Sequence, residues 1–218
     1  MSKQETLIQL INHLFDFDRE QSDRGPYQLQ DFVAYLNTRT SAGPLPMRQI
    51  GGEEETWIRE KNRNQKNDIS ILLVLLYRYA KGYVKKALRN SIIQTADEFS
   101  FLITLMTFES LTKTELINKQ VMEKTSGTEV IKRLLNQGLI HEFADQQDKR
   151  SVRVAITDKG KKEIVGILPE MQVVSKVVAG NLDESEVATL LYLLRKLDYH
   201  HNDIFLHRKN AALQELLP

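Results

Sequence analysis

Apolar residues recur at helical spacing near the N-terminus and predict two helices there. The first covers residues 3–17, and a second, shorter helix covers residues 29–37, after the break formed by Gly25 and Pro26. Residues 38–56 are rich in glycine and proline and contain three consecutive glutamates, a composition that favours a loop. We therefore expect an N-terminal helical appendage that ends at a domain boundary near residue 60.

The middle of the chain predicts a cluster of helices with marked starts. A long and strongly apolar helix is expected over about residues 69–89. Three later helix starts carry the spacing of a capping box, in which Ser or Thr is followed three residues later by Glu. These pairs are Thr95 with Glu98, Thr112 with Glu115, and Ser126 with Glu129, and Gly138 stands where the last of these helices should end.

After Gly138 the apolar positions alternate and predict two strands, over residues 139–143 and 152–156. A polar stretch separates them, so they should form a β-hairpin with a charged tip. Thr157 is expected to cap the next helix, which Pro169 should kink or interrupt before residues 171–178. A final helix should begin at the box formed by Asp183 and Glu186 and carry an apolar stripe over residues 187–197.

The order of these elements is that of a helix-turn-helix with an attached wing, in a mainly α protein of the α+β class. The first turns of the candidate recognition helix are rich in hydroxyl and cationic side chains, which suit base edges and phosphates in a major groove. These candidate DNA-binding residues are Lys124, Thr125, Ser126, Thr128, Lys132 and Arg133. Gly127 disfavours a helix by about 1 kcal/mol relative to alanine. Either a close approach to DNA or a frayed first turn explains that glycine.

The tip of the predicted hairpin is strongly charged. Lys149 and Arg150 lie at the tip, and Arg153 follows on the second strand, where cationic side chains can reach phosphates or the minor groove. Asp148 would repel phosphate unless it pairs with Arg150 or Arg153 and orients that side chain. A solvated turn whose charges neutralise one another is the alternative that the composition leaves open.

Charge is unevenly distributed along the chain, although the formal net charge is only +1. Residues 113–162 carry 11 Lys and Arg against 7 Asp and Glu, a net charge of +4, whereas residues 163–218 carry 5 against 8, a net charge of −3. A locally basic central segment suits a module that faces a polyanion. A chance fluctuation in a solvated surface is the competing interpretation.

Several classes of function are disfavoured by what the sequence lacks. The chain has no cysteine, which excludes disulfides, thiolate metal sites and thiol-based catalysis or redox sensing. Neither a secretory signal nor a membrane span is evident, so we expect a cytoplasmic protein. No glycine-rich phosphate loop, nucleophile elbow or pair of catalytic carboxylates is present, so we expect neither an enzyme nor a cofactor.

A weak metal hypothesis comes from the C-terminal region. His200, His201 and His207 lie near Asp198 and Asp203, and His200 and His207 fall on one helical face. Metal ligation needs three or four ligands that converge in a protected site. A solvated polar face is therefore the default interpretation.

The stretch LLNQGLIHEFADQQDKRSVRVAITDKGKK resembles the MarR (multiple antibiotic resistance regulator) family. The matching elements are a helix that ends in Leu-x-x-x-Gly-Leu, the wing Asp148-x-Arg150, the strand 152–156 and Thr157-x-x-Gly160, with weaker similarity over roughly residues 69–200. In one respect the chain departs from the commoner pattern, at Ser126-Gly127-Thr128-Glu129. There Glu129 would have to cap the helix or read a cytosine amino group.

The resemblance implies a homodimer in which the helix near residues 69–89 and two C-terminal helices intertwine. It divides the chain into an extension (1–60), a first dimerisation helix (61–94), a winged helix-turn-helix domain (95–160) and C-terminal dimerisation helices (161–218). Two recognition helices would then lie roughly 34 Å apart and bind a pseudo-palindromic operator. Arg150 and Arg153 carry over as wing contacts to DNA.

The resemblance also implies a repressor that releases double-stranded DNA when a small anionic or phenolic effector binds between the dimer helices and the winged domain. Tyr79, Tyr83 and Phe101 are candidates to line that crevice, although core packing is the stronger expectation for them. Two other hypotheses about the function stay open. One is a winged-helix module that docks proteins, with residues 1–60 as a partner surface, and the other is a metal-responsive regulator that uses His200 and His207.

Overall fold

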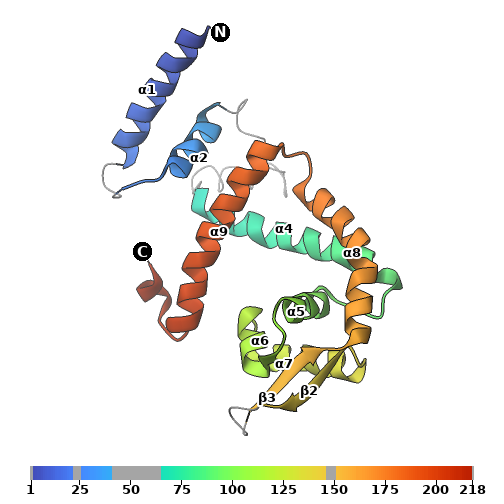
Figure 1. The fold of residues 1–218 in the computed structure, drawn as a ribbon. Coiled ribbons are helices and arrows are strands. Elements are labelled where there is room, and N and C mark those ends of the chain that lie inside the picture. The colour runs from blue at the N-terminus through green and yellow to red at the C-terminus, as the bar shows by residue number, and fades with distance from the viewer. Residues whose placement is uncertain (1, 22–25, 41–64, 146–150, 218) are drawn as a thin grey trace, which may run out of the picture. The chain divides into compact units, whose positions relative to one another are not determined.

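The computed structural model describes residues 2–21, 26–40, 65–145 and 151–217, and it divides into two compact units (Figure 1). The central unit comprises residues 63–181. The terminal unit combines residues 1–62 with residues 182–218. The expected boundary near residue 60 stays a prediction, because residues 41–64 lie outside the described part of the chain.

The central unit begins with the long helix α4 (Gln65–Ala87), which continues into a short 3-10 turn (Leu88–Asn90). Three helices follow, α5 (Ala96–Thr107), α6 (Lys113–Lys119) and α7 (Lys124–Asn136). The last helix of this unit is α8 (Asp158–Ala179). All of these helices were expected from the apolar pattern, so the predicted order of elements is confirmed.

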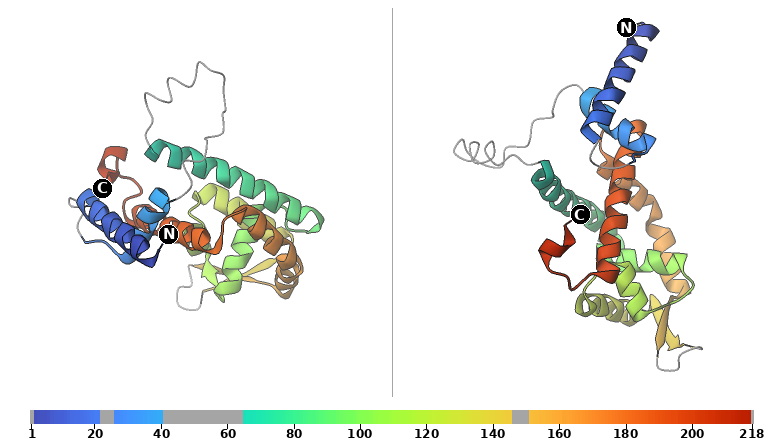
Figure 2. Two further views of the ribbon diagram at one scale, coloured as in Figure 1. Left: turned by 90° about the horizontal axis from the view of Figure 1, so that it is seen from above. Right: turned by 90° about the vertical axis from the view of Figure 1, so that its left-hand side faces the viewer.

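A small antiparallel sheet completes the central unit, with β1 (Leu111–Thr112), β2 (Ile140–Ala144) and β3 (Val152–Ile156) in the order β1-β3-β2. Strands β2 and β3 are the predicted hairpin, and they pair with Ile140 opposite Ile156. Figure 2 shows this hairpin projecting from the helices of its unit. Strand β1 was not expected, because two residues are too few to show an alternating pattern.

The core of the central unit lies between α5, α6, α7, the sheet and the start of α8. Phe101, Leu102 and Leu134 are completely buried there. The first turn of α8 packs directly on the backbone at the start of β2, since a Cβ atom added to Gly160 would lie 2.3 Å from the carbonyl oxygen of Leu139. The residue at position 160 must therefore be glycine for α8 to leave the sheet at this point.

Helix α8 continues through Pro169, so of the two expected outcomes, a kink or an interruption, the interruption is excluded. A proline in a helix removes the hydrogen bond to the carbonyl four residues earlier, which here belongs to Val165. The Val165 side chain is 58% exposed, so this turn faces solvent and water can bind the free carbonyl. The segment 171–178 is therefore the second half of one continuous helix.

The terminal unit contains α1 (Lys3–Gln21), α2 (Leu29–Thr40), α9 (Glu184–His207) and a short 3-10 helix (Leu213–Leu216). An aromatic cluster joins α1 to α2, because the ring of Phe17 contacts the rings of Tyr27, Phe32 and Tyr35. Helix α2 extends to Thr40, three residues into the stretch that we expected to be a loop. The rest of that stretch lies outside the described residues.

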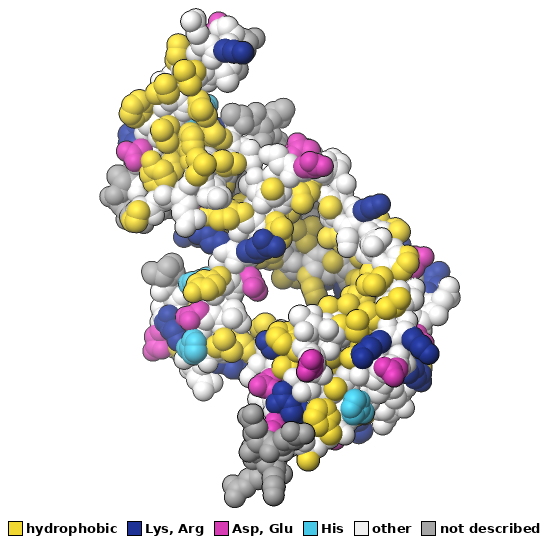
Figure 3. All heavy atoms as spheres, in the orientation of Figure 1, with side chains coloured by type: hydrophobic (Ala, Val, Ile, Leu, Met, Phe, Trp, Pro, Cys, Tyr) yellow, Lys and Arg dark blue, Asp and Glu magenta, His cyan; other side chains and the backbone are white. Residues whose placement is uncertain are grey.

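The terminal unit leaves many apolar side chains exposed. On α1 these side chains are between 39% and 67% exposed, and they are Leu7, Ile8, Leu10, Ile11, Leu14 and Phe15. Figure 3 shows apolar side chains gathered over this helix. Among the described residues of both units, no helix has the length and apolar character needed to cross a membrane.

Candidate nucleic-acid interface

The helix-turn-helix consists of α6 and α7. Helix α6 begins with the predicted capping box, because the hydroxyl of Thr112 accepts a bond from the Glu115 N–H (3.2 Å) and the Glu115 carboxylate accepts one from the Thr112 N–H (2.7 Å). The bond from the Thr112 backbone also lowers the pKa of Glu115 below its ordinary value. The carboxylate that caps α6 is therefore charged at neutral pH.

The turn between the two helices contains a strained residue. The N–H of Val121 donates to the carbonyl of Asn118 (2.9 Å), and the N–H of Met122 donates to that of Ile117 (3.3 Å), which is a Schellman arrangement. Val121 has a φ of 52°, a left-handed conformation that costs a β-branched residue about 1–2 kcal/mol. Helix α7 ends in the same way at Gly138 (φ 67°), the glycine that we expected there.

Gly127 is required by the contact between the two helices. It is buried on the inner face of α7, and a Cβ atom added to it would lie 2.6 Å from Cγ1 of Ile117 on α6. Neither of the explanations offered by the sequence accounts for this glycine. It lies in a regular helical turn, and it faces α6 and not the solvent where DNA would bind.

Helix α7 begins at Lys124, three residues earlier than expected from the pair Ser126 and Glu129. Its N-cap is Glu123, which makes no side-chain capping bond, and the Glu123 carbonyl accepts from the Gly127 N–H (2.9 Å). The predicted third capping box is therefore wrong. The packing of Gly127 against α6 requires a helical backbone at positions where a box would need an extended one. Glu129 does not cap α7, so only its possible base-reading role stays a prediction.

The exposed face of α7 carries most of the predicted DNA-binding residues. Five of them lie along this face and are exposed, namely Lys124, Thr125, Ser126, Thr128 and Lys132. The hydroxyl of Thr128 donates to the Lys124 carbonyl (2.7 Å), so its oxygen is left to accept bonds from outside. The structure thus brings hydroxyl and cationic groups together on one side of the helix.

Arg133, the sixth candidate on α7, is held by a buried carboxylate. Its Nε donates to Oε1 of Glu98 on α5 (2.7 Å), and the Glu98 side chain is completely buried. The other carboxylate oxygen accepts from the N–H of Gln94 (2.8 Å). Arg133 therefore ties α7 to the start of α5. The sequence had assigned Glu98 only to a capping box, in which Thr95 does accept from the Glu98 N–H but the Glu98 carboxylate binds elsewhere.

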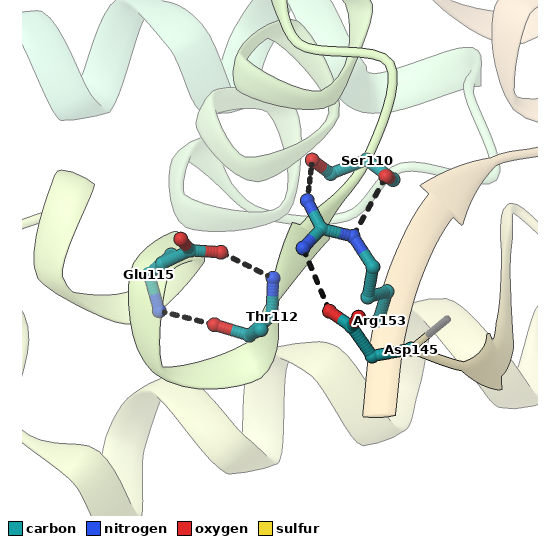
Figure 4. A network of polar contacts seen from close by, with 5 residues as sticks. All are labelled: Ser110, Thr112, Glu115, Asp145 and Arg153. Atoms are coloured by element: carbon teal, nitrogen blue, oxygen red, sulfur yellow. Dashed lines mark hydrogen bonds and ion pairs between the residues drawn. The ribbon is translucent and has the colours of Figure 1, made fainter. Parts of the chain in front are cut away.

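The base of the wing is fixed by Arg153 (Figure 4). Its guanidinium donates from Nη1 to the Asp145 carboxylate (2.9 Å), from Nε to the Ser110 hydroxyl (2.9 Å) and from Nη2 to the Ser110 carbonyl (2.7 Å). These bonds join β3 to the end of β2 and to the residue before β1. Among the described residues, the carboxylate that orients Arg153 is therefore that of Asp145. The predicted pairing of Asp148 with Arg150 or Arg153 lies outside the described residues and stays a prediction.

The other wing candidates lie outside the described residues. They are Asp148, Lys149 and Arg150, and their proposed contacts with DNA or with one another stay predictions. The same holds for DNA contact by Arg153 and Arg133, whose side chains are 27% and 42% exposed while engaged in the bonds above.

The three candidate effector residues do not share one surface. Phe101 is completely buried in the core, in line with the stronger expectation for it. Tyr79 is 43% exposed on α4, and Tyr83 is half-buried on the same helix. Only the two tyrosines can therefore face a ligand directly.

The C-terminal histidines form no metal centre in the described part of the chain. No group of three potential ligands converges there. His207 lies 3.9 Å from Asp203, and both side chains are largely exposed. This arrangement is that of a solvated helix face.

Comparisons with known proteins agree with this geometry. Residues 102–160 match the family model of a winged helix DNA-binding domain. The HTH-type transcriptional repressor NicR of Pseudomonas putida is 27% identical over 103 residues, which are 47% of this chain and 65% of NicR. The match therefore spans just under two thirds of that relative's length.

Solved structures show the same fold. BpsR of Bordetella bronchiseptica, studied for the regulation of its DNA binding by 6-hydroxynicotinic acid, matches with a TM-score of 0.56 and 22% identity, over 60% of this chain and 98% of BpsR. A cysteine-to-serine mutant of MarR from E. coli, complexed with operator DNA, matches with a TM-score of 0.57 and 24% identity, over 62% and 96%. The matching proteins are regulators and not enzymes. The chain therefore carries a winged helix DNA-binding domain within a fold of the MarR type.

Proposed function

We propose that this chain is a sequence-specific transcription regulator that binds double-stranded DNA through α7 and the wing. The observation that carries the proposal is the exposed face of α7, where Lys124, Thr125 and Lys132 lie opposite the buried face of the same helix. Hydroxyl and cationic groups at the start of such a helix suit base edges and phosphates of a major groove. The net charge of +4 over residues 113–162 adds a general attraction to DNA.

The regulator acts as a homodimer. Apolar faces on α4, α8 and α9 support this, because their side chains are exposed and would be buried by a second copy; examples are Leu72, Val173 and Leu191. A two-fold axis would repeat the winged domain about one turn of duplex away. The operator is then pseudo-palindromic.

We further propose that the regulator is a cytoplasmic repressor whose DNA binding responds to a small anionic effector. Its relative NicR is named a transcriptional repressor, and the DNA binding of BpsR is regulated by 6-hydroxynicotinic acid. Both statements belong to those proteins. They support a similar mode of action here.

Selection of bound fragments from a genomic library by the purified full chain tests the proposal. We expect the recovered fragments to share an inverted repeat whose half-sites are centred about 10 base pairs apart. Fragments with a single half-site would contradict the homodimer. Recovery of no common motif would contradict sequence-specific binding.

The salt dependence of binding separates a DNA regulator from a winged helix that docks proteins. Each neutralised phosphate should contribute about −0.9 to the slope of log K against log salt concentration. Arg150→Ala should make the slope shallower by about one unit, whereas Lys176→Ala, at an exposed site on α8, should leave it unchanged. Thr125→Ala and Thr128→Ala should instead alter sequence preference. An unchanged slope in Arg150→Ala would remove the wing from the interface.

A further inference from the structure

A basic hollow of about 500 Å³ lies at the C-terminal end of α4, beside the loop that leads to α5. It is lined by Gly82, Lys85, Lys86, Leu88, Arg89, Ser91 and Gln94. Three of these side chains are cationic and none is acidic. No acidic side chain of the lining therefore neutralises the three positive charges.

The cationic side chains share one helical face. Gly82, Lys85, Lys86 and Arg89 follow the spacing i, i+3, i+4 and i+7, which places them side by side. A Cβ atom added to Gly82 would meet no atom within 4 Å, so the glycine leaves the hollow open at that end. Within the described residues, none of the three cations forms an ion pair, and Lys86 only approaches the ring of Tyr83 (5.9 Å). Like charges at this spacing repel one another, and a bound anion would relieve that repulsion.

The basic hollow lies at the opposite end of α7 from its first turn, where most of the residues that we assign to DNA lie. The side-chain amide of Gln137 donates to the carbonyl of Ile92 (3.3 Å), so the loop 91–94 contacts the C-terminal end of α7. Of the exposed candidates, Lys124 lies thirteen residues earlier, about 20 Å at 1.5 Å per residue, whereas Lys132 lies five residues earlier, about 8 Å. The three cations of the hollow lie on α4 and the turn after it, and the proposed contact of α7 with DNA assigns them no role.

Two links connect the basic hollow to α7. Gln94 lines the hollow, and its N–H donates to Glu98, whose other carboxylate oxygen accepts from Arg133 on α7. The second link is the bond from Gln137 to Ile92. In the described structure the Oε1 atom of Gln137 is buried without a hydrogen-bond partner, so this link leaves one polar group unsatisfied. A change in the position of Gln94 or Ile92 would therefore reach α7 through these two links.

We propose that the basic hollow binds a small, multiply charged oxyanion, such as a phosphate ester, and that the bound anion alters DNA binding through the loop 91–94. Oxyanions form charge-assisted hydrogen bonds with Lys and Arg, and the Ser91 hydroxyl and the Gln94 amide add neutral donors. The lining of the basic hollow does not include Tyr79, Tyr83 or Phe101, although Lys86 lies beside the ring of Tyr83. Its effect on DNA rests on the proposed function, whereas anion binding itself does not.

Titration of inorganic pyrophosphate into the full chain, followed by calorimetry, tests the site directly. The double variant Lys85→Gln/Arg89→Gln removes two of the three cations. The control Lys162→Gln/Lys176→Gln removes two exposed cations from α8 in the same unit. We expect the dissociation constant to rise at least about tenfold in the first variant and less than about twofold in the control.

Equal affinities in the wild type and both variants would overturn the site, because binding would then reflect general attraction to a cationic surface. Cations at a helix C-terminus also stabilise the helix dipole, so thermal unfolding should be recorded for each variant. If Lys85→Gln/Arg89→Gln is folded at the assay temperature and binds pyrophosphate as tightly as the wild type, the proposed site is overturned.

A second arm measures affinity for a DNA fragment recovered by the genomic selection, with and without saturating pyrophosphate at constant ionic strength. We expect pyrophosphate to change the dissociation constant at least about threefold in the wild type and not in Lys85→Gln/Arg89→Gln. If that variant instead binds DNA more weakly without pyrophosphate and with a shallower salt slope, the cations contact DNA phosphates and the effector site is overturned. Absence of DNA binding by the wild type would contradict the proposed function, while the calorimetric result would still decide the site.

Discussion

The winged helix domain and the helices that flank it differ in where their apolar side chains lie. Between Leu88 and Ile167 a cluster of 17 buried hydrophobic residues forms one closed core. Helix α9 has no buried residue at all, and its stripe, which includes Leu191 and Leu194, is about 40% exposed. Since burial of apolar surface is the main source of folding free energy, the domain is stabilised by its own chain and the flanking helices require another surface.

We expect the largest change in unfolding free energy from the substitution of a glycine that packs against the closed core. Gly160 and Gly166 both lie on α8, but a Cβ atom at position 160 would lie 2.3 Å from the Leu139 carbonyl oxygen, whereas one at position 166 meets nothing within 4 Å. We expect Gly160→Ala to lower the free energy of unfolding by about 3 kcal/mol, because neither backbone can move without opening the core. Gly166→Ala should raise it by about 0.5–1 kcal/mol through helix propensity. Urea denaturation of the two variants measures the difference, and equal effects would show that the core is not closed at Gly160.

We expect the next largest effect, on the dissociation constant of the dimer, from a substitution in the exposed apolar stripe of α9. Leu191→Glu places a carboxylate where a second copy would bury an apolar side chain, which costs about 2 kcal/mol or more. The dimer dissociation constant should therefore rise at least about thirtyfold. Arg195→Glu introduces the same carboxylate side chain at an exposed polar position of α9 and should change the dissociation constant little, although it alters the net charge by two units and not one.

Sedimentation equilibrium of both α9 variants gives the dissociation constants, and circular dichroism reports whether the winged domain is folded. A monomer with a folded winged domain would support the contrast between the two regions. A Leu191→Glu protein that dimerises as tightly as the wild type would remove α9 from the interface.

Features that depend on neighbouring residues are the ones that the sequence predicts well. Local signals sufficed for the boxes at Thr112 and Asp183 and for the glycine at 138, because each depends on residues three or four positions apart. The start of α7 was missed for a different reason. It is determined by the contact of Gly127 with Ile117 on another helix, and no local pattern reports that contact.

In the candidate site, too, some features follow from the local sequence and others only from the folded chain. The exposed residues of α7 follow from its amphipathic period, since the side opposite Val130 and Leu134 must face solvent. The bonding partners of the two arginines do not follow from any pattern. Arg133 binds Glu98 across 35 positions of the sequence and Arg153 binds Ser110 across 43, so only the folded chain brings them together.

A smaller effect should come from the strained turn of the winged domain. Val121→Gly should raise the free energy of unfolding by about 1 kcal/mol, because glycine adopts a φ of 52° without the steric cost that valine pays. Val165→Gly, at an exposed position inside α8, should lower it by about 0.5–1 kcal/mol. Because the turn lies within the self-contained domain, Val121→Gly should leave dimer dissociation unchanged. Thermal or urea unfolding measures the first effect, and a loss of stability in Val121→Gly would contradict the assigned strain.

The smallest effect should come from the polar link between the flanking helices α2 and α9. The Lys196 ammonium lies 2.7 Å from the Asp31 carboxylate and, together with the Gln28 N–H, lowers the pKa of Asp31 below its ordinary value of 3.8. A carboxyl group whose pKa is lower in the folded state stabilises the protein above the pKa of the unfolded state, and this stability is lost as the pH falls through the folded value.

The wild type should therefore exceed Asp31→Asn in unfolding free energy at pH 6, by less than about 1 kcal/mol because Lys196 is largely exposed. The difference should shrink as the pH is lowered from about 4 toward 2, where the wild-type carboxylate becomes protonated and resembles the amide. Urea titrations of both proteins at these pH values measure it, and comparison with the variant cancels the acid titration of all other groups. A difference that stayed constant with pH would mean that packing, and not the charge of Asp31, joins α2 to α9. The flanking helices would then hold together as the winged domain does, by shape and apolar contact.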